Sequence, residues 1–160
     1  MRSSITKRLA LIAMIPATLL AMVAVASPAQ AAVNTTKLQS DVNYLTNKQR
    51  TAHGCKALRT DARLTSAAIA HSTYMGRGGA FSHTGSGGST FDARIKKAGY
   101  AAPAAENIAF GYRTGVEVVK AWMASPGHRA NILNCQNKTV GVGAVVGKSG
   151  AIYYTQDFGY

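Results

Sequence analysis

The sequence has few acidic side chains. It carries six Asp and Glu residues against 18 Lys and Arg among 160 residues, and its formal net charge is +12 at pH 7. A field of this sign favours anionic partners, which outside a cell are wall polymers or lipid head groups. The basic residues are scattered and form no stripe interleaved with aromatic side chains. The composition therefore argues against a nucleic-acid-binding protein.

Long apolar runs are also rare, and the clearest one lies at the N-terminus, over Leu9–Ala26. Basic residues precede this run, and the small-residue pattern Ala29-x-Ala31 follows it, as in a secretory signal peptide with its cleavage site. The alternative is a membrane anchor, but no basic stop-transfer cluster follows. We therefore predict a signal peptide over residues 1–31 and a secreted chain over residues 32–160, with no membrane span after cleavage.

The predicted secreted chain has the length of one domain and shows no internal repeat. Three of the 18 basic residues lie in residues 1–31, so 15 remain in residues 32–160 against all six acids, a balance of +9. The strongly basic character is thus a property of the domain itself. We expect it to hold the protein near an anionic cell wall or membrane surface.

Cysteine is limited to Cys55 and Cys135, both in the predicted secreted chain. Two thiols in an oxidising compartment most simply form one disulfide. The alternative, a free reactive thiol pair, is disfavoured by the compartment. The bridge would close a loop of about eighty residues, which the chain-entropy model rates at about 4 kcal/mol of stabilisation.

Hydrophobic periodicity and turn residues predict several helices, an extended segment and a terminal β-hairpin. The predicted helices cover residues 36–50, 60–75, 91–98 and 114–125, with a further helical turn at 128–133; the extended segment is 104–112 and the hairpin 140–158. Thr36-x-x-Gln39 has the form of a capping box for the first helix. Helices followed by a terminal hairpin indicate an α+β fold in which helices cover the sheet.

Among the acids, Glu106 has no evident structural role. Asp61, Asp92 and Glu117 stand at helix starts, where a carboxylate meets unsatisfied N–H groups, and Asp157 near the last strand's end has many cations to pair with. Glu106 instead lies inside an apolar segment, where a carboxylate needs a cation, a donor or a metal. The alternative is an internal glutamate with ordinary hydrogen bonds.

Two of the four histidines lie on irregular segments, where functional side chains are often presented. His83 lies in the Gly- and Ser-rich run 76–90, and His128 follows Ser125-Pro126-Gly127. His71, by contrast, falls on the apolar face of the second helix, and we expect it to be packed with its nitrogens satisfied. The sequence has no H-E-x-x-H or G-x-S-x-G motif, so spacing alone assigns no reaction.

Five short motifs occur in a distinctive order. They are F-S-H-T at 81–84, A-E-N-I-A at 105–109, W-M-A-S-P-G-H-R-A-N-I-L at 122–133, V-G-V-G at 140–143 and Q-D-F-G at 156–159. This set resembles the CAP superfamily, also called SCP, of cysteine-rich secretory proteins, antigen 5 and pathogenesis-related 1 proteins. The resemblance spans essentially the whole predicted secreted chain and is strongest to the secreted bacterial branch.

The resemblance implies an α-β-α sandwich around a short antiparallel sheet, with a wide surface cleft. In many eukaryotic members the cleft holds two histidines and two glutamates that bind a divalent cation such as zinc. By motif, His83, Glu106 and His128 match three of these positions, and Ser125 stands where the second glutamate would fall. Two imidazoles and a carboxylate can hold Zn²⁺, but a neutral hydroxyl is a poor fourth ligand, so we expect any zinc to bind weakly.

The resemblance and the residues together leave three hypotheses for function. The favoured one is a secreted binding module, not an enzyme, whose His83, Glu106 and His128 cleft takes a metal, a lipid or an anionic wall polymer. The second is a secreted hydrolase, either with Ser125 in a Ser-His-Glu set in which Glu106 orients His128, or with a zinc-activated water. Under the third, the cleft residues form a purely structural network, and Ser125 simply ends a helix before proline.

Overall fold

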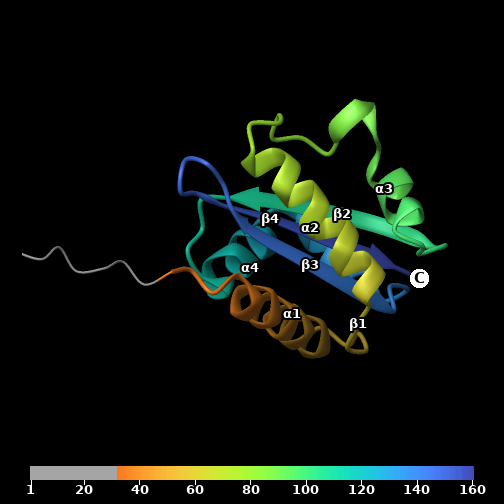
Figure 1. Ribbon diagram of the computed structural model, residues 1–160. Coiled ribbons are helices and arrows are strands. Elements are labelled where there is room, and N and C mark those ends of the chain that lie inside the picture. Colours follow the sequence, from red (N-terminus) through yellow and green to blue (C-terminus); the bar gives the residue numbers. More distant parts are fainter. Residues whose placement is uncertain (1–31) are drawn as a thin grey trace, which may run out of the picture. The chain divides into compact units, whose positions relative to one another are not determined.

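The computed structural model describes residues 32–160, and the predicted signal peptide, residues 1–31, lies outside the described residues. Figure 1 shows the order of the elements. The helices are α1 (Thr35–Ala52), α2 (Ala62–Gly76), α3 (Phe91–Lys97), α4 (Gly115–Ala124) and α5 (Pro126–Ile132), with a short 3-10 turn at Ser86–Gly88. The strands are β1 (Arg59–Thr60), β2 (Pro103–Phe110), β3 (Thr139–Val146) and β4 (Ile152–Gly159).

Side-chain caps fix where three of the helices begin. The Asp61 carboxylate accepts from the Arg63 N–H at the start of α2, and Thr114 and Glu117 form a reciprocal capping box at the start of α4. For α1 the predicted box at Thr36 is wrong. The cap is Asn34, whose side chain accepts a hydrogen bond from the Lys37 N–H at 2.9 Å. Because α1 already begins at Thr35, Thr36 lies inside its first turn and cannot be the N-cap.

The sheet has the strand order β1-β3-β4-β2. The predicted hairpin is confirmed as β3 and β4, and β2 pairs with β4 in antiparallel register. The two-residue strand β1 was not predicted, and it pairs with β3 in parallel. The sheet is therefore mixed, and antiparallel only over its three long strands.

Helices cover both faces of the sheet, which confirms the α+β fold and the α-β-α sandwich. Successive side chains of a strand point to opposite faces. Thr155 of β4 accepts a hydrogen bond from Ser72 of α2, whereas the next residue, Gln156, donates to Thr46 of α1. Helix α2 therefore covers one face, with α3 beside it, and α1 covers the other, packed against α4 and α5 (Figure 1).

The disulfide between Cys55 and Cys135 is confirmed, and it joins the chain after α1 to the chain after α5. The buried Arg50 reinforces the same junction, because its guanidinium donates to the carbonyl oxygens of Lys56, Ile132, Asn134 and Asn137. Burial lowers the pKa of Arg50. Within residues 32–160, no helix combines the length and the apolar character needed to cross a bilayer.

Candidate functional site

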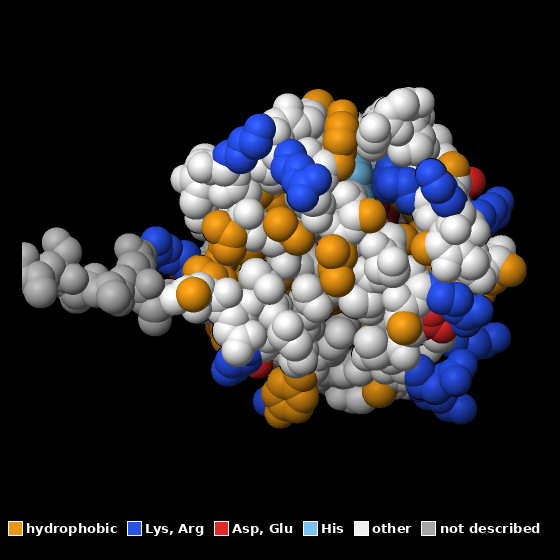
Figure 2. Space-filling view, viewed as in Figure 1, with side chains coloured by type: hydrophobic (Ala, Val, Ile, Leu, Met, Phe, Trp, Pro, Cys, Tyr) orange, Lys and Arg blue, Asp and Glu red, His pale blue; other side chains and the backbone are white. Residues whose placement is uncertain are grey.

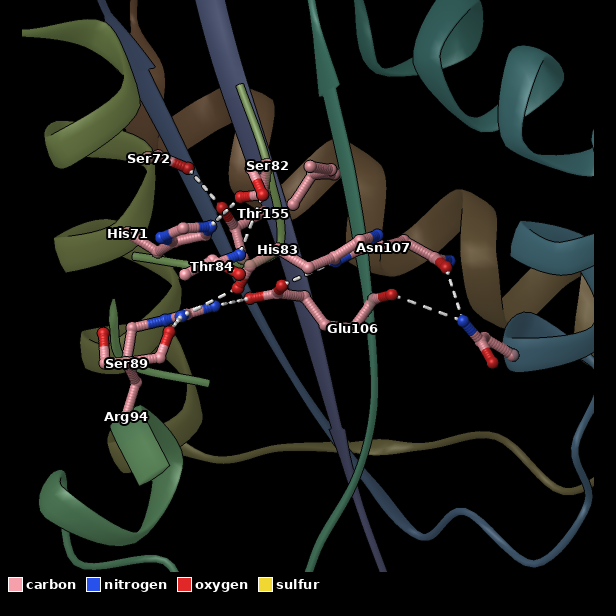
Figure 3. Close-up of polar contacts among 12 residues, drawn as sticks. His71, Ser72, Ser82, His83, Thr84, Ser89, Arg94, Glu106, Asn107 and Thr155 are labelled. Atoms are coloured by element: carbon pink, nitrogen blue, oxygen red, sulfur yellow. Dashed lines mark hydrogen bonds and ion pairs between the residues drawn. The ribbon is translucent and has the colours of Figure 1, made fainter. Parts of the chain in front are cut away.

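The Gly-rich segment between α2 and α3 brings His83 to Glu106 of β2 (Figure 3). The His83 Nδ1 atom lies 2.8 Å from Glu106 Oε1. A carboxylate can only accept, so Nδ1 carries the hydrogen and the Nε2 atom of the ring is left for other partners. The Glu106 side chain is 1% exposed and that of His83 is 54% exposed. The pair thus runs from a buried carboxylate to an imidazole at the surface.

Arg94 of α3 is the second partner of Glu106, and sequence reasoning missed it. Its Nη2 atom donates to Glu106 Oε2 at 2.6 Å, while Nη1 donates to the carbonyl oxygens of His83 at 3.0 Å and Ser89 at 2.8 Å. One guanidinium therefore neutralises the buried carboxylate and fixes both the backbone of His83 and the end of its loop. No motif marks Arg94, because its role arises only when α3 folds back over β2.

His128 is held near this pair by a network of amide side chains between α5 and β2. Asn107 donates to the His128 carbonyl oxygen at 3.2 Å, and Asn131 donates to the Asn107 side-chain oxygen at 2.9 Å and to the Glu106 carbonyl oxygen at 3.3 Å. Burial, and to a smaller degree the charge of His83, lower the pKa of His128. The structure thus brings His83, Glu106 and His128 into one region.

The predicted Ser-His-Glu set is not assembled in the described part of the chain. No hydrogen bond there links Ser125 to His128, and both oxygens of Glu106 are taken by His83 and Arg94. The expectation that Glu106 orients His128 is therefore wrong, because the loop places His83 nearer to the carboxylate. Ser125 caps the junction between α4 and α5, with Pro126 as the first residue of α5.

Ser125 and His128 line a hollow of about 280 Å³, which we call the aromatic cleft. Its other lining residues are Phe81, Ile108, Ala109, Phe110, Tyr112, Ala121 and Trp122. Phe81 and Phe110 are 48% and 50% exposed. Their rings meet edge to face with centroids 4.9 Å apart, and Phe110 stacks on Tyr153 at 5.6 Å. Sequence reasoning missed this cleft, because its aromatic rim comes from three distant segments.

The environment of Asp157 in the structure differs from the one predicted. Asp157 was expected to pair with a cation, but it is 1% exposed, and within the described residues its Oδ1 atom has no hydrogen-bond partner. It stands directly across from Glu106 in the pairing of β2 with β4. Burial, followed by the negative charge of Glu106, raises the pKa of Asp157 well above its usual value. Burial beside Glu106 thus disfavours the ionised form of Asp157.

The prediction for His71 is confirmed for its burial but not for its hydrogen bonds. His71 is buried at 1% exposure, as expected, and its Nε2 atom lies 2.9 Å from the carbonyl oxygen of Ser82. Its Nδ1 atom, however, has no hydrogen-bond partner among residues 32–160. Burial is the main cause that lowers the pKa of His71.

The side chains present do not fit a resident zinc ion. In the described residues, no three His, Cys, Asp or Glu side chains come together as a metal site. The Arg94 guanidinium occupies the Glu106 oxygen that a metal would need, and its positive charge opposes a second cation there. Ser125 adds only a neutral hydroxyl in place of the anionic ligand suggested by the resemblance.

Comparison with known proteins agrees with this fold and these motifs. The model of the cysteine-rich secretory protein family, CAP, matches residues 44–158. The chain therefore belongs to the CAP family, which confirms the resemblance seen in the sequence.

Relatives of this chain occur in bacteria. It is 44% identical to YkwD of Bacillus subtilis over 122 residues, covering 75% of this chain and 46% of that protein. A Bacillus anthracis structure, described as an extracellular protein containing a SCP domain, is 31% identical with a TM-score of 0.72, and the match covers 78% of this chain and 41% of that one. The chain thus spans less than half the length of these two relatives.

An outer surface protein of Borrelia burgdorferi shares the fold. It has a TM-score of 0.72 at 22% identity, and the match covers 79% of this chain and 95% of that one. The two structural relatives are thus described as extracellular and outer-surface proteins.

Proposed function

We propose that this chain is a secreted binding module whose aromatic cleft takes a fragment of the bacterial cell wall. The observation that carries the proposal is the cleft itself, where two half-exposed phenylalanine rings face solvent beside the imidazole of His128. Large apolar side chains left exposed together are a mark of a binding surface. A recessed apolar hollow with a few polar groups is the usual form of a ligand site.

The chemistry of the cleft favours an amphipathic ligand. The rings of Phe81 and Phe110 offer apolar faces, and the polar groups in the lining are those of Tyr112, Ser125 and His128. His83, beside Phe81 in the chain, has a half-exposed ring whose Nδ1 atom is already used by Glu106. A ligand with one apolar face and hydrogen-bonding groups along its edge fits this arrangement. Wall glycopeptides have both.

The charge of the domain supports a wall location. Residues 32–160 hold 15 basic and six acidic side chains, and Figure 2 shows Lys and Arg around the visible face with few Asp or Glu. An anionic wall polymer would attract this surface over the whole domain, whereas the cleft would select the fragment. Salt that screens the electrostatic attraction between the basic surface and the wall should therefore leave binding in the cleft measurable.

Cosedimentation with purified bacterial walls tests the proposal, using the protein of residues 32–160. We expect Phe110→Ala to weaken binding about tenfold at a salt concentration that screens the basic surface. Tyr44→Ala is the matched control, because Tyr44 is an aromatic residue 64% exposed on α1, outside the cleft lining. Equal loss in both variants, or no loss in either, would contradict a role for the cleft.

A hydrolase is the second candidate, and the contact between His83 and Glu106 favours it. A carboxylate that orients an imidazole through Nδ1 leaves Nε2 poised as a general base, as in hydrolytic triads. Ser125 lines the cleft but is not bonded to a histidine in residues 32–160. If wall fragments are cleaved, full activity in Ser125→Ala would exclude Ser125 as the nucleophile, and loss of activity in His83→Ala would support His83 as the base.

A further inference from the structure

A second hollow lies between α2 and α3. Its volume is about 460 Å³, within the range of small-molecule sites. Its lining is Ser66, Ala67, Ala70, His71, Tyr74, Ser86, Ser89, Ala93, Arg94, Lys97 and Ala98. It shares no lining residue with the aromatic cleft. We call it the α2/α3 pocket.

Four alanines contribute methyl groups to the walls of the α2/α3 pocket. Ala67 and Ala70 come from α2, and Ala93 and Ala98 come from the α3 segment. Small side chains on both helices leave room between them and present a shallow apolar surface. A short aliphatic group fits such a surface.

Two buried polar atoms beside this pocket lack partners in the described chain. His71 donates through Nε2 to the Ser82 carbonyl oxygen, which can only accept, so its Nδ1 atom holds a lone pair and is an unused acceptor. Arg94 uses both terminal nitrogens, but its Nε–H is an unused donor. Native structures rarely leave such buried groups unpaired, so a missing partner is expected.

The two groups belong to one small region. A β-carbon built on Gly85 would lie 3.2 Å from His71 Nδ1 and 3.0 Å from Arg94 Nη1, so both side chains converge on the same point. Figure 3 shows His71 and Arg94 on the same side of β2. The turn that begins at Gly85 therefore lies against the His71 ring and the Arg94 guanidinium. Gly87 and Gly88 have positive φ angles of 65° and 77°, which make this turn one that few other residues could form.

From this donor and acceptor we infer that the α2/α3 pocket binds a secondary amide that carries a small acyl group. The amide oxygen accepts from Arg94 Nε–H, the amide N–H donates to His71 Nδ1, and the acyl methyl packs on the alanines of the wall. Binding requires the turn at residues 85–88 to shift. Lys97 at the rim is exposed and can pair with a carboxylate on the same ligand. The inference does not depend on the proposed function of the aromatic cleft.

Two sources supply this chemistry, namely the acetamido group of an amino sugar and an N-acylated amino acid. The probes are N-acetylmuramic acid for the sugar and N-acetyl-alanine for the amino acid, each titrated into the ¹⁵N-labelled protein of residues 32–160. We expect amide signals to shift in 66–74 and 85–98. The probe that binds more tightly identifies the source. Acetate and glucosamine, which lack the amide, should leave these signals in place.

Variants separate the pocket from the cleft. Ala70→Leu places a larger side chain in the pocket at an exposed position, and we expect it to abolish the shifts. Ala62→Leu, on the same helix but outside this lining, is the control. His71→Phe keeps an aromatic ring but removes both ring nitrogens, the unused acceptor Nδ1 among them, and we expect about tenfold weaker binding.

Three results would overturn the inference. One is the absence of shifts with either amide probe, which would mean that water satisfies both atoms. Another is undiminished binding by Ala70→Leu. The third is shifts confined to the residues of the aromatic cleft.

Discussion

At the scale of single residues, the partners of Glu106 decide what the site can do. One oxygen receives His83 and the other receives Arg94, so the buried carboxylate is already neutralised within the protein. An arginine cannot lose its proton at physiological pH, and a metal ion would therefore have to displace a fixed charge. Arg94 thus separates this site from the two-histidine, two-glutamate cleft that the resemblance suggested.

Replacement of Arg94 should create the zinc affinity that the native side chains oppose. We expect Arg94→Gln to bind Zn²⁺ at least about tenfold more tightly than the native protein, because an uncompensated carboxylate then faces His83. The measurement is calorimetric titration of chelator-stripped protein. Arg63→Gln is the control, since Arg63 pairs with Asp61 at the surface. Tight zinc binding by the native protein, lost in His83→Ala/His128→Ala, would show that Arg94 does not block the site.

The buried acid Asp157 gives the protein a distinct dependence on pH. Its pKa is raised in the folded state, so its contribution to stability is present below the unfolded pKa of about 4 and is lost as pH rises through the folded value. Asn at this position does not titrate. We expect the free energy of unfolding of Asp157→Asn, relative to that of the native protein, to increase as the pH rises above about 4.

Chemical denaturation over a pH series measures this difference, and Asp61→Asn supplies a control of opposite sign. The hydrogen bond from the Arg63 side chain lowers the pKa of Asp61 to about 2, so its contribution is present above about 4 and lost as pH falls toward that value. Asn also caps helices well. A flat difference between native protein and Asp157→Asn would show that Asp157 is ionised in the fold.

Sequence reasoning reached only part of this site for a physical reason. His83 and Glu106 stood out because each lies in a local setting that does not suit its side chain, a Gly-rich run and an apolar strand. Arg94 and Asp157 lie in settings that suit an arginine and an aspartate, a short helix and the end of a strand. Their roles depend on which elements pack together, and neither periodicity nor spacing carries that information.

At the scale of elements, the sheet and α2 approach each other more closely than side chains normally allow. A β-carbon on Gly143 would lie 2.4 Å from the backbone of Ala68, and one on Gly141 would lie 2.1 Å from that of Thr65. The V-G-V-G pattern of β3 therefore places valine side chains on one face of the strand. The glycines leave the other face without side chains, so α2 packs directly against the strand backbone. The alternation predicted the strand but not this contact.

This close contact makes Gly143→Ala destabilising. The added methyl meets helix backbone, which cannot rotate away, and we expect a loss of about 1–3 kcal/mol in the free energy of unfolding. Gly127→Ala is the matched control, because Gly127 lies in α5 with nothing within 4 Å of its added β-carbon. Alanine there should stabilise the protein by up to about 1 kcal/mol. Equal thermal stability of the two variants would contradict this packing account.

The elements themselves were largely predictable. Long amphipathic helices and the alternating hairpin carry their own periodicity, and α4 also carries its capping box. Strand β1 escaped prediction because two residues hold no period and pair only with a distant strand. The cap of α1 was misplaced because Asn34 and Thr36 both have suitable side chains, and only the helix start observed in the structure distinguishes them.

At the scale of the whole molecule, a basic domain carries two hollows that share no lining residue. The disulfide and Arg50 hold the ends of α1 and α5 together, and α5 in turn presents His128 to the aromatic cleft. The general charge and the local cleft thus act at different ranges, the first on a wall as a whole and the second on a fragment of it.

The most direct test of this account is a crystal structure of residues 32–160 soaked with a muropeptide released from bacterial peptidoglycan. We predict that the fragment lies in the aromatic cleft, against Phe81 and Phe110 and within hydrogen-bonding reach of His128. A muropeptide bound only to Lys and Arg on the surface, with the cleft empty, would contradict the central claim.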